Sequence, residues 1–296
     1  EYEIGCDLVR GCGFREASVL AVNSKSKKYS ISRAGMNIAD DAMFCTRGFV
    51  IRVFDGTLSA EYSCSEIGDD SFVAIGEALE NIIGETKKRM NINQQPECVP
   101  ETKHAAETEY FTEYEIHPEE MGDDAILSHL DKIRSKTLAC DENVMDCSVV
   151  CSYRRLAKRF LRGADGKILE QKEQNILWMT SAAMVLVARG EEIKDYYKGY
   201  SNLGGAEVLA EMEADVENNV KCAVALLDSE PIVPGEYECI CTPDVTGMIV
   251  HEAFGHGVEM DMFVKKRALA EQYIGESVAS PLVTMHDLSL IHISEP

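Results

Sequence analysis

Two histidines and a glutamate lie close together near the C-terminal end of the sequence. His251 and Glu252 are adjacent, and His256 is the fifth residue after His251. A neutral imidazole is a good zinc ligand, and a carboxylate beside it can accept a proton from a metal-bound water molecule. The residue types therefore indicate His251 and His256 as candidate Zn²⁺ ligands and Glu252 as the candidate catalytic base.

The spacing of the two histidines restricts the geometry of such a site. Residues five apart on a straight helix lie roughly 140° out of phase, because each residue turns the helix by about 100°. Both imidazoles can bind one ion only if the backbone is overwound, bulged or ended between them. Gly255 and Gly257 flank His256, which is where such a distortion costs least. Without the distortion, the segment is a helix end that carries two histidines by chance.

A short helix is predicted over residues 243–257 to position these side chains. Thr242 suits the N-cap, Pro243 suits the first helical position, and Gly257 is where a left-handed terminal residue would fall. A strand over 236–241 is expected to lead directly into the helix, which would hold the site rigidly. Three apolar residues of the helix are expected to anchor it in a core: Met248, Ile249 and Val250.

This stretch resembles the TldD/PmbA family, metallopeptidases once described as modulators of DNA gyrase. The most specific part of the resemblance runs over residues 251–287, and it includes the segment Tyr273–Asp287. Upstream, Arg47–Gly56 is similar to a strand of the family's first domain, so the resemblance spans most of the chain. PmbA-like members lack the metal motif, and this chain is therefore similar to the TldD side of the family.

The resemblance implies a zinc metallopeptidase that hydrolyses short or unfolded peptides, with a zinc-bound water activated by Glu252. It also implies a PmbA-like (TldE-like) partner subunit. In the family the third metal ligand is a cysteine in the C-terminal portion, and no residue of this chain matches it. We therefore expect the isolated fragment to bind zinc weakly and to be inactive. A non-catalytic peptide-binding or regulatory member of the same fold is the alternative, although a pure binder does not need Glu252.

Glu259 is a further candidate because it follows His256 by three residues. A carboxylate there can hydrogen-bond to a metal-ligating imidazole, or it can line a groove for the substrate. The alternative is that it belongs to an exposed amphipathic segment with no role in the site. The sequence leaves this choice open.

The net charge of the chain indicates which kinds of binding partner are unfavourable. The 296 residues contain 51 acidic and 29 basic residues, which gives a formal net charge of −22. This acidity argues against nucleic acid as a partner, because no basic surface remains to neutralise phosphates. No apolar run approaches the roughly 18 residues of a membrane span, so we expect no membrane association and a cytoplasmic protein.

The eleven cysteines predict free thiols instead of a disulfide framework. Their number is odd, and no two of them form a Cys-x-x-Cys pair. Several lie in apolar runs, so we expect buried, reduced thiols in a cytosolic chain. Cys239 and Cys241 would point to the same side of a strand, which makes a second metal site conceivable but weakly supported.

The predicted fold class is α+β, with two N-terminal units and the start of a β-rich metallopeptidase C-terminal domain. The first unit covers residues 1–95, and a polar linker covers 96–122. The central unit covers 123–228, and the C-terminal domain begins over 229–287, where the family resemblance implies that it is truncated. Residues 288–296 do not continue the family pattern and are interpreted as a non-native tail, so His292 is not counted as a ligand.

Hydrophobic patterns predict the elements of the two N-terminal units. In the first unit, strands are expected within 17–30 and over 48–54, followed by a return strand through Tyr62 and a helix from Ser71. The second unit is expected to contain helices over 123–135 and 206–227, a strand over 144–153, a turn at 163–166, and strands over 167–189 that include a buried pair in 176–187.

Overall fold

The computed structural model describes residues 14–68, 71–89, 106–259, 262–263 and 266–285. The chain divides into two compact units, residues 1–229 and residues 230–296, and each unit is described by itself. The first unit is built on one mixed eight-stranded sheet with helices, so the predicted α+β class is confirmed.

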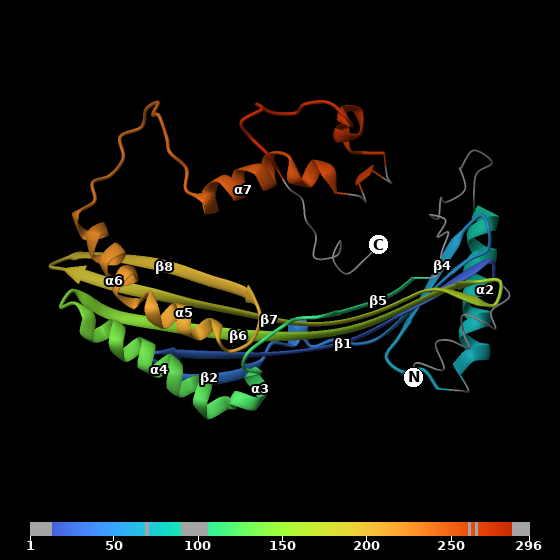
Figure 1. Ribbon diagram of the computed structural model, residues 1–296, viewed down its shortest axis with the longest axis horizontal. Coiled ribbons are helices and arrows are strands. Elements are labelled where there is room, and N and C mark those ends of the chain that lie inside the picture. Colours follow the sequence, from blue (N-terminus) through green and yellow to red (C-terminus); the bar gives the residue numbers. More distant parts are fainter. Residues whose placement is uncertain (1–13, 69–70, 90–105, 260–261, 264–265, 286–296) are drawn as a thin grey trace. The chain divides into compact units, whose positions relative to one another are not determined.

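A long antiparallel hairpin forms the centre of the sheet (Figure 1). Its strands are β6 (Val144–Ala164) and β7 (Lys167–Arg189). The two residues of the turn, Asp165 and Gly166, have φ angles of 50° and 72°, which is the positive-φ pair that a tight hairpin turn requires. The turn was predicted, whereas the expected strand pair within 176–187 is wrong because β7 is one continuous strand through this region.

Strand β1 (Glu16–Ser32) pairs antiparallel with β6 and carries the first part of the chain into the same sheet. Along its other edge, β1 pairs first with β3 (Arg47–Phe54) and then with β2 (Gly35–Asp40). The strand β4 (Ser59–Cys64) continues the sheet beyond β3, and β8 (Glu192–Leu203) pairs with β7 at the opposite edge. We call the end of the sheet that contains β3 and β4 the β3–β4 half, and the end that contains β8 the β8 half.

Helix α2 (Ser71–Arg89) packs on the β3–β4 half. Its buried side chains are Ile75, Leu79 and Ile83, which recur at the four-residue spacing of one helix face. They pack against strand residues that include Val19, Ile51 and Val53. Ile82 was predicted to belong to this apolar stripe, but it lies off the buried row and is exposed.

Helices α4 (Asp123–Cys140), α5 (Val208–Ala214) and α6 (Val216–Ala225) cover the β8 half (Figure 1). The α4 residues Ile126, Leu130 and Ile133 are completely buried against this half. The helix predicted over 206–227 is divided into α5 and α6 at Asp215. The Asp215 carboxylate accepts a hydrogen bond from the Tyr200 hydroxyl at 3.2 Å.

The segment 96–122 is not a linker over the residues that the structure describes. Residues 106–111 form strand β5 (Ala106–Phe111), which pairs parallel with β7, and α3 (Pro118–Met121) follows. This strand lies at an edge and is polar, so no apolar pattern in the sequence indicates it. Residues 96–105 lie outside the described residues.

The segments 1–95 and 123–228 share the sheet, because β1 and β6 pair directly over most of their length. The sheet carries two apolar clusters, and each draws residues from both segments: Leu161 of β6 belongs to one, and Tyr29 and Ile31 of β1 belong to the other. One cluster lies under α2, and the other lies under α4, α5 and α6. The first compact unit therefore has two cores on one continuous sheet, and their boundary does not follow the predicted division of the chain.

The second unit contains α7 (Pro243–Ala253) and the 3₁₀ turns η3 (Gly255–Val258) and η4 (Leu269–Tyr273). The strand predicted over 236–241 is not formed, and this segment has no regular structure. The interpreted tail, 288–296, lies outside the described residues. Among the described residues, no helix is both long and apolar enough to cross a membrane.

Candidate metal centre

Helix α7 begins where the sequence predicts. Thr242 occupies the N-cap position with extended backbone angles, and Pro243 is in the first turn. The Thr242 side chain makes no capping hydrogen bond, but its backbone carbonyl accepts the N–H of Thr246 at 2.9 Å. Proline fits because the first turn of a helix has no intrahelical partner for its N–H.

The helix ends between the two histidines. Ala253 is its last residue, and Phe254 has φ −139° and ψ −31°, which is outside the helical region. The chain continues in η3, where the N–H of Gly257 donates to the carbonyl of Phe254 at 2.9 Å. Gly257 does not adopt a positive φ, so the predicted left-handed terminus is wrong. A 3₁₀ turn ends the helix instead.

This break brings the two imidazoles together. The ring centroids of His251 and His256 lie 4.5 Å apart with the planes at 65°. The candidate ligand atoms of His251, Glu252 and His256 all lie within 4.8 Å of one another. Among the described residues, this is the only such group of three His, Cys, Asp or Glu side chains. The histidine spacing is therefore compatible with a common ion.

Gly255 has a second role that the sequence does not indicate. A β-carbon at this position would lie 3.4 Å from Nδ1 of His251, at the short end of ordinary van der Waals contact. Gly255 is also buried, although the three candidate ligands around it are exposed. A side chain at position 255 would therefore lie directly against the His251 ring, and the spacing in the sequence does not indicate that proximity.

Glu259 lies against His256. Its Oε1 is 2.7 Å from Nδ1 of His256, and Oε2 of Glu252 is 3.7 Å from Nε2 of the same ring. The hydrogen bond to Glu259, with a smaller effect of Glu252, raises the pKa of His256. When the neutral ring donates from Nδ1 to a carboxylate, Nε2 keeps its lone pair for a metal ion.

The apolar residues of α7 are less buried than expected. Met248 and Ile249 are 65% and 53% exposed, so they do not anchor the helix in a core of the described residues. Phe254 is half-buried, and with Val250 it lines an apolar cavity of about 750 Å³ formed with residues 277–285. The lining positions of α7 lie on the helix face away from His251.

The cysteines are free, but they are not uniformly buried. Cys147 and Cys151 are buried as predicted, and no described cysteine is in a disulfide. Cys45 and Cys140 are exposed, which differs from the expectation of buried thiols. Cys239 and Cys241 are also exposed and do not belong to the group formed by the candidate ligands, so the described residues give no support to a second site there.

The donor set of this group suits a zinc ion. Zn²⁺ binds imidazole nitrogen and carboxylate oxygen, and two imidazoles with an adjacent carboxylate are typical components of catalytic sites. Catalytic zinc usually has three protein ligands, so the two histidines leave one position to be supplied by another residue. The ligand types therefore fit zinc, but the number of protein ligands is one short of a typical catalytic site.

Comparison with known proteins supports this assignment of the region. Residues 234–294 match the family described as PmbA/TldA metallopeptidase C-terminal domain. The chain is 29% identical over 126 residues to a metalloprotease of Methanothermobacter thermautotrophicus, covering 42% of this chain and 27% of that protein. It is 34% identical over 65 residues to a metalloprotease of Methanocaldococcus jannaschii, covering 22% of this chain and 14% of that protein.

One solved structure resembles the fold over nearly the whole chain. It is a crystal structure from Bacteroides thetaiotaomicron of a protein described as a candidate modulator of DNA gyrase. The TM-score is 0.65 with 13% sequence identity, and the match covers 94% of this chain and 62% of that one. The chain thus spans less than two thirds of these relatives, and the likeness at this identity concerns the fold.

Proposed function

Because this chain belongs to the TldD/PmbA family, we propose that it is part of a zinc-dependent peptidase in which His251 and His256 hold the ion. The observation that carries the proposal is the convergence of the two imidazoles at the break after Ala253. The metalloprotease names of the relatives support the reaction class. Zinc is the proposed metal because nitrogen ligands suit it.

Glu252 is the proposed general base. When bound, the zinc ion would act as a Lewis acid that makes water more acidic and a carbonyl more electrophilic. Glu252 accepts a proton from the attacking water while the oxygen of that water forms a bond to the scissile carbonyl carbon. The same carboxyl group then gives that proton to the amine nitrogen as the C–N bond breaks. Its position beside His256 supports this role.

Glu259 is proposed as a positioning residue. Its carboxylate accepts the Nδ1 proton of His256 and so fixes the ring orientation and tautomer that leave Nε2 for the ion. The third ligand is proposed to be a cysteine outside this chain. From the family resemblance we propose three further properties: short or unfolded peptides as substrates, a PmbA-like partner subunit and a cytoplasmic location.

Replacement of Glu252 in a longer version of the protein that includes the third ligand tests the reaction. We expect Glu252→Ala to lower the rate of peptide cleavage by at least about 100-fold, as general-base removal typically does. Bound zinc, measured in parallel, should be retained. The control is Glu271→Ala, an exposed acid in η4 outside the site. Cleavage by Glu252→Ala at the wild-type rate would show that the assigned role is wrong.

A non-catalytic peptide-binding member gives a different result in the same experiment. In that case the unaltered protein binds peptides without cleaving them, and Glu252→Ala leaves peptide affinity unchanged. Peptide affinity and cleavage are therefore measured on the same samples, which separates the two functions.

A further inference from the structure

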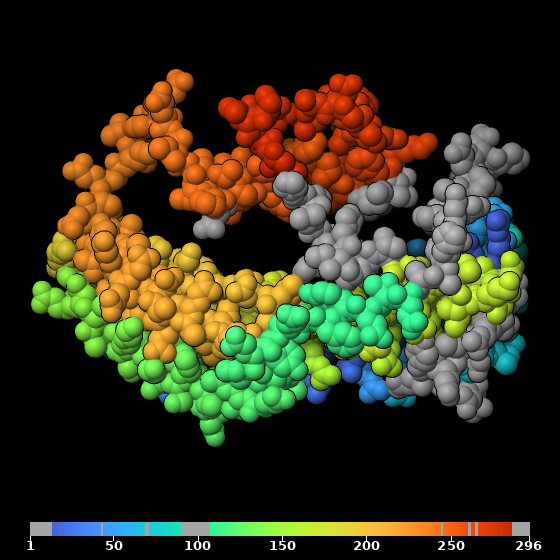
Figure 2. Space-filling model, viewed as in Figure 1, coloured from blue at the N-terminus to red at the C-terminus, as the bar shows by residue number. Residues whose placement is uncertain are grey.

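A second polar site lies in the first compact unit, beside α3. A cavity of about 540 Å³ is formed where β6 and β7 meet the segment that follows β5. This volume is within the range of small-molecule sites in proteins. Figure 2 shows the segment 106–121 (teal to green) at the surface of this unit. The side chains used below are Phe111, Tyr114, His117, Glu119, Glu120 and Arg155.

Arg155 supplies an available positive charge. It lies directly across from Lys25 in the register of β1 and β6, so the two cations share one face of the sheet. Paired positions lie about 5 Å apart, and like charges there are destabilising unless an anion lies between them. Lys25 is 4.0 Å from Glu119, whereas Arg155 is exposed and has no ion-pair partner among the described residues. Its guanidinium group is therefore free to bind a carboxylate through two parallel hydrogen bonds.

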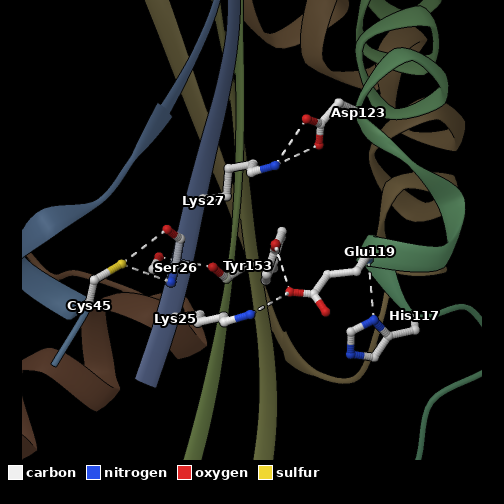
Figure 3. A network of polar contacts seen from close by, with 8 residues as sticks. All are labelled: Lys25, Ser26, Lys27, Cys45, His117, Glu119, Asp123 and Tyr153. Carbon is white, nitrogen blue, oxygen red and sulfur yellow. Dashed lines mark hydrogen bonds and ion pairs between the residues drawn. The ribbon is translucent and has the colours of Figure 1, made fainter. Parts of the chain in front are cut away.

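The same cavity contains negative charge. Glu119 and Glu120 both line it, and Glu120 is exposed without an ion-pair partner in the part of the chain that the structure describes. The Glu119 carboxylate is held by Lys25 and by the Tyr153 hydroxyl, which is 3.4 Å away (Figure 3). Glu119 is thus held in place from one side, and Glu120 remains available to a cationic group.

Two exposed aromatic rings contribute to the apolar lining of the cavity. Phe111 and Tyr114 are 54% and 49% exposed, so their rings are accessible to a ligand in the cavity. Tyr114 is held edge-to-face against His117, with ring centroids 5.2 Å apart. The Nδ1 atom of His117 accepts the backbone N–H of Glu119, so both side chains belong to one connected wall.

A cation, an anion and exposed rings in one cavity are complementary to a zwitterion with an apolar ring. We propose that this cavity binds a free α-amino acid with an aromatic side chain. Its carboxylate binds Arg155, its ammonium group binds Glu120, and its ring packs on Phe111 and Tyr114. This site goes beyond the proposed peptidase function and does not depend on it, although free amino acids are a chemical class that peptide hydrolysis releases.

Calorimetric titration of the whole chain with L-phenylalanine tests the site. We expect saturable binding, and at least about tenfold weaker binding of phenylalaninamide, which lacks the carboxylate, and of N-acetylphenylalanine, which lacks the ammonium group. Arg155→Gln should weaken phenylalanine binding by a similar factor. The matched control is Arg159→Gln on the same strand, where the arginine pairs with Glu173 outside the cavity.

Glu120→Gln and Tyr114→Ala provide a second test that does not depend on the folding of the Arg155 variant, since neither residue lies in the central strand β6. Glu120→Gln should weaken phenylalanine binding at least about tenfold but leave N-acetylphenylalanine binding unchanged, because that analogue has no ammonium group. The proposal is overturned if phenylalanine shows no saturable binding up to about 10 mM. It is also overturned if the Arg155, Glu120 and Tyr114 variants bind phenylalanine as tightly as the unaltered protein does. The same holds if the two analogues bind the unaltered protein as tightly as phenylalanine does.

Discussion

The Oε1 atom of Glu259 lies 2.7 Å from Nδ1 of His256, on the side of the ring opposite the nitrogen that faces Glu252. The two carboxylates therefore contact different nitrogens of one imidazole. This arrangement separates a residue that orients a ligand from a residue placed to move a proton.

Removal of the Glu259 carboxylate should weaken metal binding. Partners of this kind are typically worth 10- to 100-fold in metal affinity, so we expect Glu259→Ala to weaken zinc binding by about tenfold or more in the longer protein. Glu259→Gln keeps an acceptor oxygen and should lose less. Chelator competition measures the affinity, and the nitrogen chemical shifts of His256 report the tautomer in the metal-free protein. Unchanged affinity and tautomer in Glu259→Ala would contradict the positioning role.

The present chain should bind zinc weakly by itself. Only two imidazoles and one carboxylate converge among the described residues, and all three are exposed, whereas catalytic sites use three protein ligands. We expect a dissociation constant well above the nanomolar range in a chelator competition assay. Nanomolar affinity would mean that the chain contains a further ligand.

Gly205 should not tolerate a side chain. A β-carbon at this position would lie 2.0 Å from the carbonyl oxygen of Ile116, and that atom belongs to the backbone. We expect Gly205→Ala to reduce the free energy of unfolding by about 2 kcal/mol or more, because the backbone must move. Gly76→Ala in α2 is the control, since nothing lies within 4 Å of its β-carbon position. That change should be neutral or stabilising by about 0.5–1 kcal/mol. Equal effects in urea unfolding would show that the close approach is absent.

Asp123 should stabilise the first unit at neutral pH. A hydrogen bond from the Tyr29 hydroxyl, followed by the ion pair with Lys27, lowers the pKa of the Asp123 carboxyl below its usual range. A lowered folded-state pKa means that the stabilisation is present above the unfolded pKa of about 4 and is lost as the pH falls through the folded pKa.

We therefore expect Asp123→Asn to reduce the free energy of unfolding most at pH 7, and progressively less below about pH 4. Urea unfolding of both proteins at a series of pH values measures this difference. A difference that grows as the pH falls would have the wrong sign and would contradict the assignment.

The cysteines should divide into reactive and protected groups. Burial raises the pKa of Cys151 to about 12 and that of Cys147 to about 11, so the reactive thiolate is scarce at both. Cys45 and Cys140 are exposed. Mass spectrometry after brief alkylation of the native protein should find Cys45 and Cys140 modified and Cys147 and Cys151 unmodified. Urea should abolish the difference, and rapid native labelling of Cys151 would contradict its burial.

Elements with a strong local pattern could be predicted from the sequence. The apolar spacing of α2 and α4 indicates each helix and most of its buried residues, because one face alone contacts the sheet. Strand β5 could not be found in this way, since backbone pairing with β7 holds it and its side chains are polar. The apolar run in β7 predicts burial correctly, but an apolar run does not show where a strand ends.

The candidate metal centre follows a similar division. The histidine spacing with its glycines required a break in the helix, and the structure has that break at Phe254. The proximity of the Gly255 β-carbon position to the His251 ring and the exposure of Met248 depend on three-dimensional packing that spacing does not encode. Arg155 was missed because its relation to Lys25 arises from the pairing of strands far apart in the sequence.

The pairing of β1 with β6 also affects the order in which the sheet can form during synthesis on the ribosome. The β6–β7 hairpin is local and can close through its two-residue turn as soon as β7 emerges. Strand β1 is made long before β6, with α2, β5 and α4 between them. Its residues Tyr29 and Ile31 pack in the cluster with β6 and β7, so they wait for a late partner. Nascent chains that stop before Val144 should therefore depend on chaperones, whereas chains that extend past Leu203 can complete the sheet.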